Sequence, residues 1–254
     1  MGYFPDFTVW QFAATCLIFI WTGFVRTGLG FGGAALGLPL MLMVHDQPIF
    51  WIPVIGSHLL LFSGLTLSNR LHNVDWVYLA KSGKWILPAA LGGVFGLLKL
   101  PNEVLLFFIY AITVFYGACW AFNKVIGSRN EAVDVFLLLL GGYVSGASLT
   151  GAPLMIAVFM RNVVLTRLRD TLFVLWFLIV SIKLITLYLV AVPLNSLAAL
   201  MLVPAATVGH VVGLKTHEFL LARDVLCKRI IGIFLLFVSG LGLLGLWTGM
   251  LGKG

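Results

Sequence analysis

Charged residues are scarce in this chain: Asp, Glu, Lys and Arg make up 10% of 254 residues, whereas hydrophobic residues make up 61%. Soluble globular proteins carry roughly 25% charged residues. The apolar runs are longer and more continuous than the alternating strands of a membrane barrel. The composition therefore excludes a soluble protein and predicts an all-α polytopic membrane protein, in which each span needs about 20 apolar residues.

Recognisable catalytic and metal-binding patterns are also missing. The three cysteines, Cys16, Cys119 and Cys227, are widely scattered and form no metal-ligand or CxxC spacing. There is no Walker motif and no nucleophile–base pair with a known spacing, so we expect neither an enzyme nor a cofactor. Gly28, Gly30 and Gly33 match GxGxxG, but a dinucleotide site needs a preceding strand and a following acidic residue, and both are absent here.

The net charge of +7 does not indicate a nucleic-acid partner. The basic residues lie mainly in short loops between apolar regions, where they set the orientation of membrane helices. The expected partners are instead the lipid bilayer and a small anionic substrate. The sequence leaves open a coupling proton or ion and a homo-oligomer.

Eight apolar regions follow one another along the chain, and two of them contain a break. The regions are 7–44, 48–69, 76–98, 103–123, 133–160, 171–190, 195–214 and 230–252. The first is interrupted by glycines at 28–33, and the fifth by 145–153, which ends in Gly151-Ala152-Pro153. Each break follows a Gly-aromatic-Val segment, 23–25 and 142–144, at an offset of 119 residues.

A second pair of similar segments supports an internal repeat. Pro88-Ala89-Ala90 recurs as Pro204-Ala205-Ala206, and each copy precedes a GxxxG pair, Gly92 with Gly96 and Gly209 with Gly213. We interpret the GxxxG pairs as sites of close helix packing. The two pairs of similar segments together predict two homologous halves, 1–127 and 128–254.

The distribution of basic residues predicts how these halves are oriented. If regions one and five are hairpins that enter and leave on one side, twelve of the sixteen Lys and Arg residues fall on the same side. Treating every region as a single span splits the loop charges about evenly. The positive-inside rule favours the hairpins. Each half then has a broken or re-entrant Gly-rich segment and three transmembrane helices, so the halves are inverted and both termini are outside.

The glycine motifs resemble those of the sulfite exporter TauE/SafE family, also called the sulfonate uptake permease family. Gly30-Phe31-Gly32-Gly33 with Pro39 resembles the first family motif, and Thr150-Gly151-Ala152-Pro153 resembles the second in eroded form. The resemblance covers nearly the whole chain. It implies a multi-pass protein of the bacterial inner membrane that transports sulfite or organosulfonates.

The two breaks predict part of the substrate site. Half-helices that begin inside a membrane point free N–H groups and partial positive charge at an anion. Gly30, Gly32, Gly33 and Gly151 are therefore predicted binding residues, with close helix packing as the alternative. Ser148 and Thr150, like Ser145, would donate hydroxyls to an oxyanion or would only bond the local backbone.

Arg26 and Lys183 lie within apolar regions that hold no Asp or Glu in the middle of any span. A mid-span cation costs roughly 2.5–3.5 kcal/mol on insertion scales. We expect the substrate to supply the missing negative charge; the alternative is that both side chains snorkel or bind backbone carbonyls. His58 lies mid-span and is the expected proton carrier or a packing residue, whereas His210 lies close to the end of its region.

We therefore predict a secondary transporter that moves a small sulfur-containing anion by alternating access. The alternatives are an anion channel and a transporter of another small organic anion such as a carboxylate. The basic segment 161–170 is either a cytoplasmic gate or, more simply, a determinant of topology.

Overall fold

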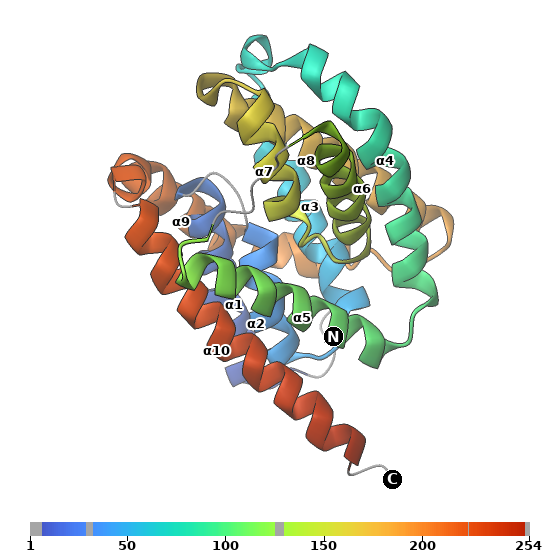
Figure 1. The fold of residues 1–254 in the computed structure, drawn as a ribbon. Helices are drawn as coiled ribbons and strands as arrows, with labels where there is room; N and C mark the ends of the chain where they lie inside the picture. Colours follow the sequence, from blue (N-terminus) through green and yellow to red (C-terminus); the bar gives the residue numbers. More distant parts are fainter. Residues whose placement is uncertain (1–6, 29–32, 125–129, 223, 252–254) are drawn as a thin grey trace. The chain divides into compact units, whose positions relative to one another are not determined.

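The computed structural model describes residues 7–28, 33–124, 130–222 and 224–251, and the regular elements in these ranges are all helical. The expected all-α architecture is confirmed. Of the residues named above, Gly30, Phe31 and Gly32 lie outside the described ranges. The helices follow the chain in this order (Figure 1): α1 Val9–Gly28, α2 Gly33–Val44, α3 Pro48–Leu67, η1 Leu71–Asn73, α4 Trp76–Lys99, α5 Asn102–Ala121, α6 Glu131–Ser148, α7 Ala152–Asn162, α8 Leu165–Leu189, α9 Ser196–Ala222 and α10 Asp224–Leu251.

Both long apolar regions are divided into two helices, as the sequence predicted. Region 7–44 forms α1 and α2, and region 133–160 forms α6 and α7. At the second break Leu149 adopts a left-handed conformation with φ 62°, and Pro153 lies in the first turn of α7. A left-handed residue ends a helix, and a proline in the first turn of the next helix sacrifices no intrahelical hydrogen bond.

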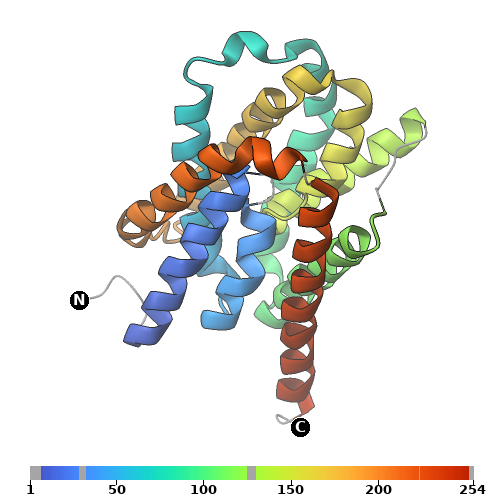
Figure 2. The same cartoon turned by 90° about the vertical axis from the view of Figure 1, so that its left-hand side faces the viewer.

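Each pair of helices folds back on itself as a hairpin. The Gln11 side chain at the start of α1 donates to the Val44 carbonyl oxygen at the end of α2, over 3.2 Å. Arg161 and Asn162 at the end of α7 donate to the Asp134 carboxylate in the first turn of α6, over 3.2 and 3.3 Å. Figures 1 and 2 show α1 and α2 side by side. Each broken region therefore begins and ends at the same end of its hairpin.

Seven of the described helices are long and apolar enough to cross a membrane: α1, α3, α5, α6, α8, Ser196–Thr216 of α9 and Val225–Thr248 of α10. Region 76–98 was predicted to span, and it does form a helix, α4, but α4 is not among the seven. Lys81 and Lys84 in its first half account for this difference. α2 and α7 are too short to cross alone, since a span needs about 20 residues.

Three boundaries differ from the sequence-based expectation. α8 begins at Leu165 rather than near 171, α9 continues past 214 to Ala222, and α10 begins at Asp224 rather than near 230. The added turns contain polar and charged residues such as Arg167 and Asp170. Hydrophobicity marks the apolar part of a membrane helix, whereas backbone hydrogen bonds continue into its polar ends.

The chain forms two compact units, each assembled from separate segments. The first comprises residues 1–51, 100–125 and 200–254, and the second comprises 52–99 and 126–199. Both units contain segments from both sequence halves. The two units are defined by contacts between residues, whereas the repeats are defined by similarity between segments of the sequence. The repeats 1–127 and 128–254 therefore stay a prediction.

In the second unit α4 packs closely on α6 through glycines. A Cβ atom added at Gly146 would collide with the backbone of Ala90, and one at Gly93 would collide with the Tyr143 carbonyl oxygen. The predicted GxxxG pair began at Gly92, yet a Cβ there would meet nothing within 4 Å. Gly96, the second member of the pair, does face α6, because a Cβ there would lie 2.7 Å from Tyr143 Oη. The correction concerns Gly92 alone: the backbone contact is at Gly93, one residue on and about 100° around the helix.

The first unit contains the corresponding contact. A Cβ at Gly209 of α9 would collide with the Ile20 carbonyl oxygen of α1, and one at Gly23 of α1 would collide with the Ala206 carbonyl oxygen. The helix that carries Pro-Ala-Ala thus packs against the helix that carries Gly-aromatic-Val in both units. The segments in contact are the ones that sequence analysis identified as repeated.

Candidate functional site

The break between α6 and α7 brings together three of the predicted polar residues and identifies which hydroxyl is free. Ser148 Oγ donates to the Val144 carbonyl oxygen over 3.0 Å and lies 2.6 Å from Thr150 Oγ1. Because a hydroxyl has a single hydrogen, Thr150 donates to Ser148 in this arrangement. Both hydroxyl hydrogens are therefore used locally. Ser145 Oγ is buried, with its residue 2% exposed, and has no hydrogen-bond partner in the described part of the chain.

Gly151 allows the N-terminus of α7 to approach α6. A Cβ at Gly151 would collide with the Gly141 carbonyl oxygen and lie 2.5 Å from Ser145 Oγ. The packing interpretation thus accounts for this glycine, and the free Ser145 hydroxyl lies beside the first turn of an 11-residue helix. A helix N-terminus carries partial positive charge and N–H groups without intrahelical partners. Sequence analysis had not separated Ser145 from its neighbours, because only contacts show which hydroxyl is already bonded.

Lys183 on α8 is 0% exposed, and its Nζ atom has no hydrogen-bond partner among the described residues. It neither snorkels to the surface nor binds a backbone carbonyl there. Those were the two alternatives to a role in anion binding. Burying an ammonium group without a partner is costly, so a bound anion in the second unit would stabilise the charged form of this side chain.

The packing of α3 against α8 places Lys183 near the middle of a span. A Cβ at Gly56 would lie 3.3 Å from the side chains of both Val180 and Leu184. Gly56 lies near the centre of α3, whose 20 residues match the thickness of a bilayer core. Lys183 is the neighbour of Leu184 in the chain, so it lies within about one turn of this central level.

His58 lies on α3, two residues beyond Gly56, and is buried. Its Nε2 atom lies 2.7 Å from the Ala199 carbonyl oxygen. A carbonyl only accepts, so Nε2 carries the hydrogen and donates it. His58 therefore has a packing and hydrogen-bonding role in this structure, and its role as a proton carrier stays a prediction.

The first unit places two further predicted residues, Arg26 and Gly33, at the α1–α2 hairpin. Arg26 is buried in the last turn of α1. A Cβ at Gly33, the first residue of α2, would lie 2.9 Å from the Arg26 Cβ and 3.0 Å from the Thr22 carbonyl oxygen. Gly33 thus lies against Arg26, and the small residue lets the two helices approach.

His210 lies closer to this group than sequence analysis indicated. Its Nδ1 atom lies 2.7 Å from Oγ1 of Thr27, the residue that follows Arg26 in the chain. Thr27 donates its hydroxyl hydrogen to the Gly23 carbonyl oxygen, so it accepts from His210 Nδ1. The apolar part of α9 that is long enough to cross a membrane ends at Thr216, so the expectation that His210 lies near the end of its span is confirmed. The helix itself continues beyond that span to Ala222.

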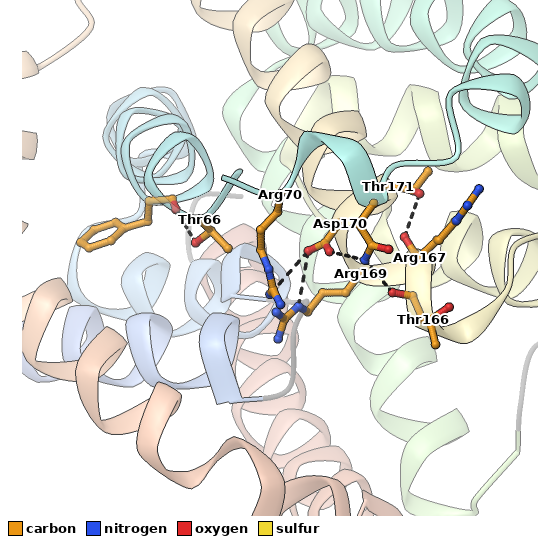
Figure 3. A network of polar contacts seen from close by, with 9 residues as sticks. Thr66, Arg70, Thr166, Arg167, Arg169, Asp170 and Thr171 are labelled. Atoms are coloured by element: carbon orange, nitrogen blue, oxygen red, sulfur yellow. Dashed lines mark hydrogen bonds and ion pairs between the residues drawn. The ribbon is translucent and has the colours of Figure 1, made fainter. Parts of the chain in front are cut away.

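A polar network joins η1 to the start of α8 (Figure 3). The Asp170 side chain is 3% exposed and lies 3.8 Å from both Arg70 Nη1 and Arg169 Nε. Asn73 Nδ2 donates to Asp170 over 2.7 Å and to the Thr166 carbonyl oxygen over 2.9 Å. This part of the segment 161–170 is therefore the basic first turn of α8 and anchors it to η1.

We expect Asp170→Asn to lower the free energy of unfolding by roughly 1–3 kcal/mol, because a buried hydrogen bond to a charged group is lost. Thermal unfolding of the purified protein in detergent measures this effect. Glu131→Gln is the matched control. It removes the carboxylate of the Lys81–Glu131 pair, which is also 3.8 Å long, but the Glu131 side chain is 89% exposed. Such surface pairs contribute little, so equal losses in the two variants would contradict the anchoring role.

Comparison with known proteins supplies one match. The family model for the sulfite exporter TauE/SafE matches residues 15–250, a range that includes all of the predicted site residues. Comparisons with curated proteins and with solved structures found no match.

Proposed function

Because the chain belongs to the sulfite exporter TauE/SafE family of membrane transporters, we propose that it is a secondary transporter that moves sulfite or an organosulfonate across the bacterial inner membrane by alternating access. The family consists of transporters rather than enzymes. The observation that carries the choice of an anion is the fully buried Lys183, whose Nζ atom has no hydrogen-bond partner among the residues that the structure describes.

The proposed binding site in the second unit combines Lys183 with the break between α6 and α7. α8, which carries Lys183, contacts both α6 and α7. The free Ser145 hydroxyl and the N-terminus of α7 would donate to the anion's oxygens, and Lys183 would balance its charge. Ser148 and Thr150 would support the break through their mutual hydrogen bond, and His58 would carry a coupling proton.

Arg26 with Gly30, Gly32 and Gly33 is the proposed contribution of the first break. Arg26 is a second buried cation beside a hairpin of the same kind. The equivalent packing of α4 on α6 and of α9 on α1 supports the descent of both breaks from one repeat. This pairing is the basis for proposing inverted halves, 1–127 and 128–254.

Inverted halves with two hairpins place the loops at Asn102 and Asn195 on the same, outer side. If every apolar region were a single span, these loops would lie on opposite sides. Single cysteines at these two positions, in a chain without Cys16, Cys119 and Cys227, can be labelled with a membrane-impermeant reagent. Labelling from opposite sides would contradict the inverted arrangement.

Reconstituted vesicles test the function itself. Purified protein should take up radiolabelled sulfite or an organosulfonate with saturation, and an excess of the unlabelled anion should compete. Uptake that rises linearly with concentration would indicate a channel instead. Saturable uptake of a carboxylate alone would overturn the choice of substrate class.

A further inference from the structure

A polar pocket of about 240 Å³ lies in the second unit, between the first turns of α4, the first turns of α6 and the end of α7. It is separate from the break between α6 and α7 and from Lys183. Charged and aromatic side chains dominate its wall, which includes Lys81, Lys84, Trp85, Glu131, Asp134 and Arg161.

The ion pairs among the described residues of this pocket leave one positive charge without a carboxylate partner. Arg161 pairs with Asp134 over 3.2 Å, and Lys81 pairs with Glu131 over 3.8 Å. Lys84 forms no ion pair with a described carboxylate, and its Nζ atom lies 5.2 Å from the centre of the Trp85 ring. Three cations and two carboxylates give the pocket one net positive charge. Lys84 carries the charge that no carboxylate balances.

Exposed apolar side chains begin directly beside the pocket. On α4, Trp76 is 52% exposed and Trp85 is 37% exposed, and tryptophans of this kind are typical of the membrane–water interface. On α6, Phe136, Leu139 and Leu140 are also exposed. Their spacing puts them on one face of α6, and Leu139 lies one helical turn beyond Val135 of the pocket wall.

We propose that this pocket binds the phosphodiester headgroup of an anionic membrane phospholipid, with its acyl chain along Phe136, Leu139 and Leu140. A phosphodiester carries one negative charge, which matches the single surplus charge at Lys84. Basic pockets between membrane helices bind anionic headgroups in this way. A free phosphate ion would leave the adjoining apolar stripe uncovered, whereas a lipid would cover both the pocket and the stripe.

Thermal unfolding in detergent, with graded additions of phosphatidylglycerol, tests this proposal. Phosphatidylcholine and inorganic phosphate serve as comparison ligands. We expect phosphatidylglycerol to raise the unfolding temperature of the wild-type protein, phosphatidylcholine to raise it less, and inorganic phosphate to leave it unchanged. Lys84→Gln should weaken phosphatidylglycerol binding about fivefold, since one lysine near a membrane surface contributes about 1 kcal/mol.

Lys99→Gln is the matched control, because Lys99 is an exposed lysine at the other end of α4 and outside the pocket. Its response to phosphatidylglycerol should equal that of the wild type. An equal loss of affinity in Lys84→Gln and Lys99→Gln would overturn the assignment to this pocket. A shift with inorganic phosphate as large as that with phosphatidylglycerol would assign the pocket to a free anion rather than a lipid.

Discussion

Lys183→Met should weaken binding of the transported anion by about tenfold to a hundredfold. A hydrogen bond to a charged group contributes roughly 1.5–3 kcal/mol, and each tenfold change in affinity corresponds to about 1.4 kcal/mol. Calorimetry with sulfite and an organosulfonate on purified protein measures the change. Methionine is close to lysine in length, so the variant removes the charge while largely retaining the packing of α8.

The stability of the empty protein separates a binding role from a structural one. Lys183 is buried, and within the described ranges its Nζ atom has no hydrogen-bond partner. Removing an uncompensated buried charge relieves a desolvation cost. We therefore expect empty Lys183→Met to unfold at the same temperature as the wild type or a higher one. Lower stability together with lost binding would show that Lys183 supports the fold instead.

Lys99→Met is the control for the loss of one positive charge, because Lys99 is exposed at the end of α4. It should bind the anion with wild-type affinity. Wild-type affinity in Lys183→Met would place the anion site elsewhere, even if reconstituted vesicles still transported sulfite. The outcome for Lys183 can thus be distinguished from the outcome for the proposed function.

Gly93→Ala should destabilise the protein by about 1–3 kcal/mol, whereas Gly92→Ala should not. A Cβ at Gly93 would collide with the backbone of α6 at Tyr143 and Ala147, and backbone atoms cannot move aside as a side chain can. A Cβ at Gly92 meets nothing within 4 Å. Alanine at that position gains up to about 1 kcal/mol of helix propensity over glycine.

Thermal unfolding of both variants in the same detergent decides between the two registers. The pair is closely matched, because the same substitution is made at adjacent residues of one helix. If Gly92→Ala were the damaging change, the GxxxG interpretation from sequence would be correct and the packing of α4 on α6 would be wrong. Gly146→Ala should resemble Gly93→Ala, since its Cβ would collide with Ala90 from the opposite helix.

Several structural features followed from the sequence alone. Composition and the length of the apolar runs determine an all-α membrane protein, because a bilayer admits only long apolar helices or closed barrels. The break at Thr150-Gly151-Ala152-Pro153 was also predictable, since glycine and proline close together favour the end of one helix and the first turn of the next, whereas single prolines such as Pro39 and Pro204 lie inside helices. These properties depend on neighbouring residues, so they can be read from the order of the chain.

Other features depended on contacts between residues far apart in the chain. Only the packing of α4 on α6 shows that Gly93 rather than Gly92 faces the partner helix. Only the hydrogen bonds show that Ser145 is free while Ser148 and Thr150 are bonded to each other. The sequence placed Lys183 inside a span, but the tertiary structure decided that it is buried without a hydrogen-bond partner, because burial and partners depend on how separate helices are rotated against one another.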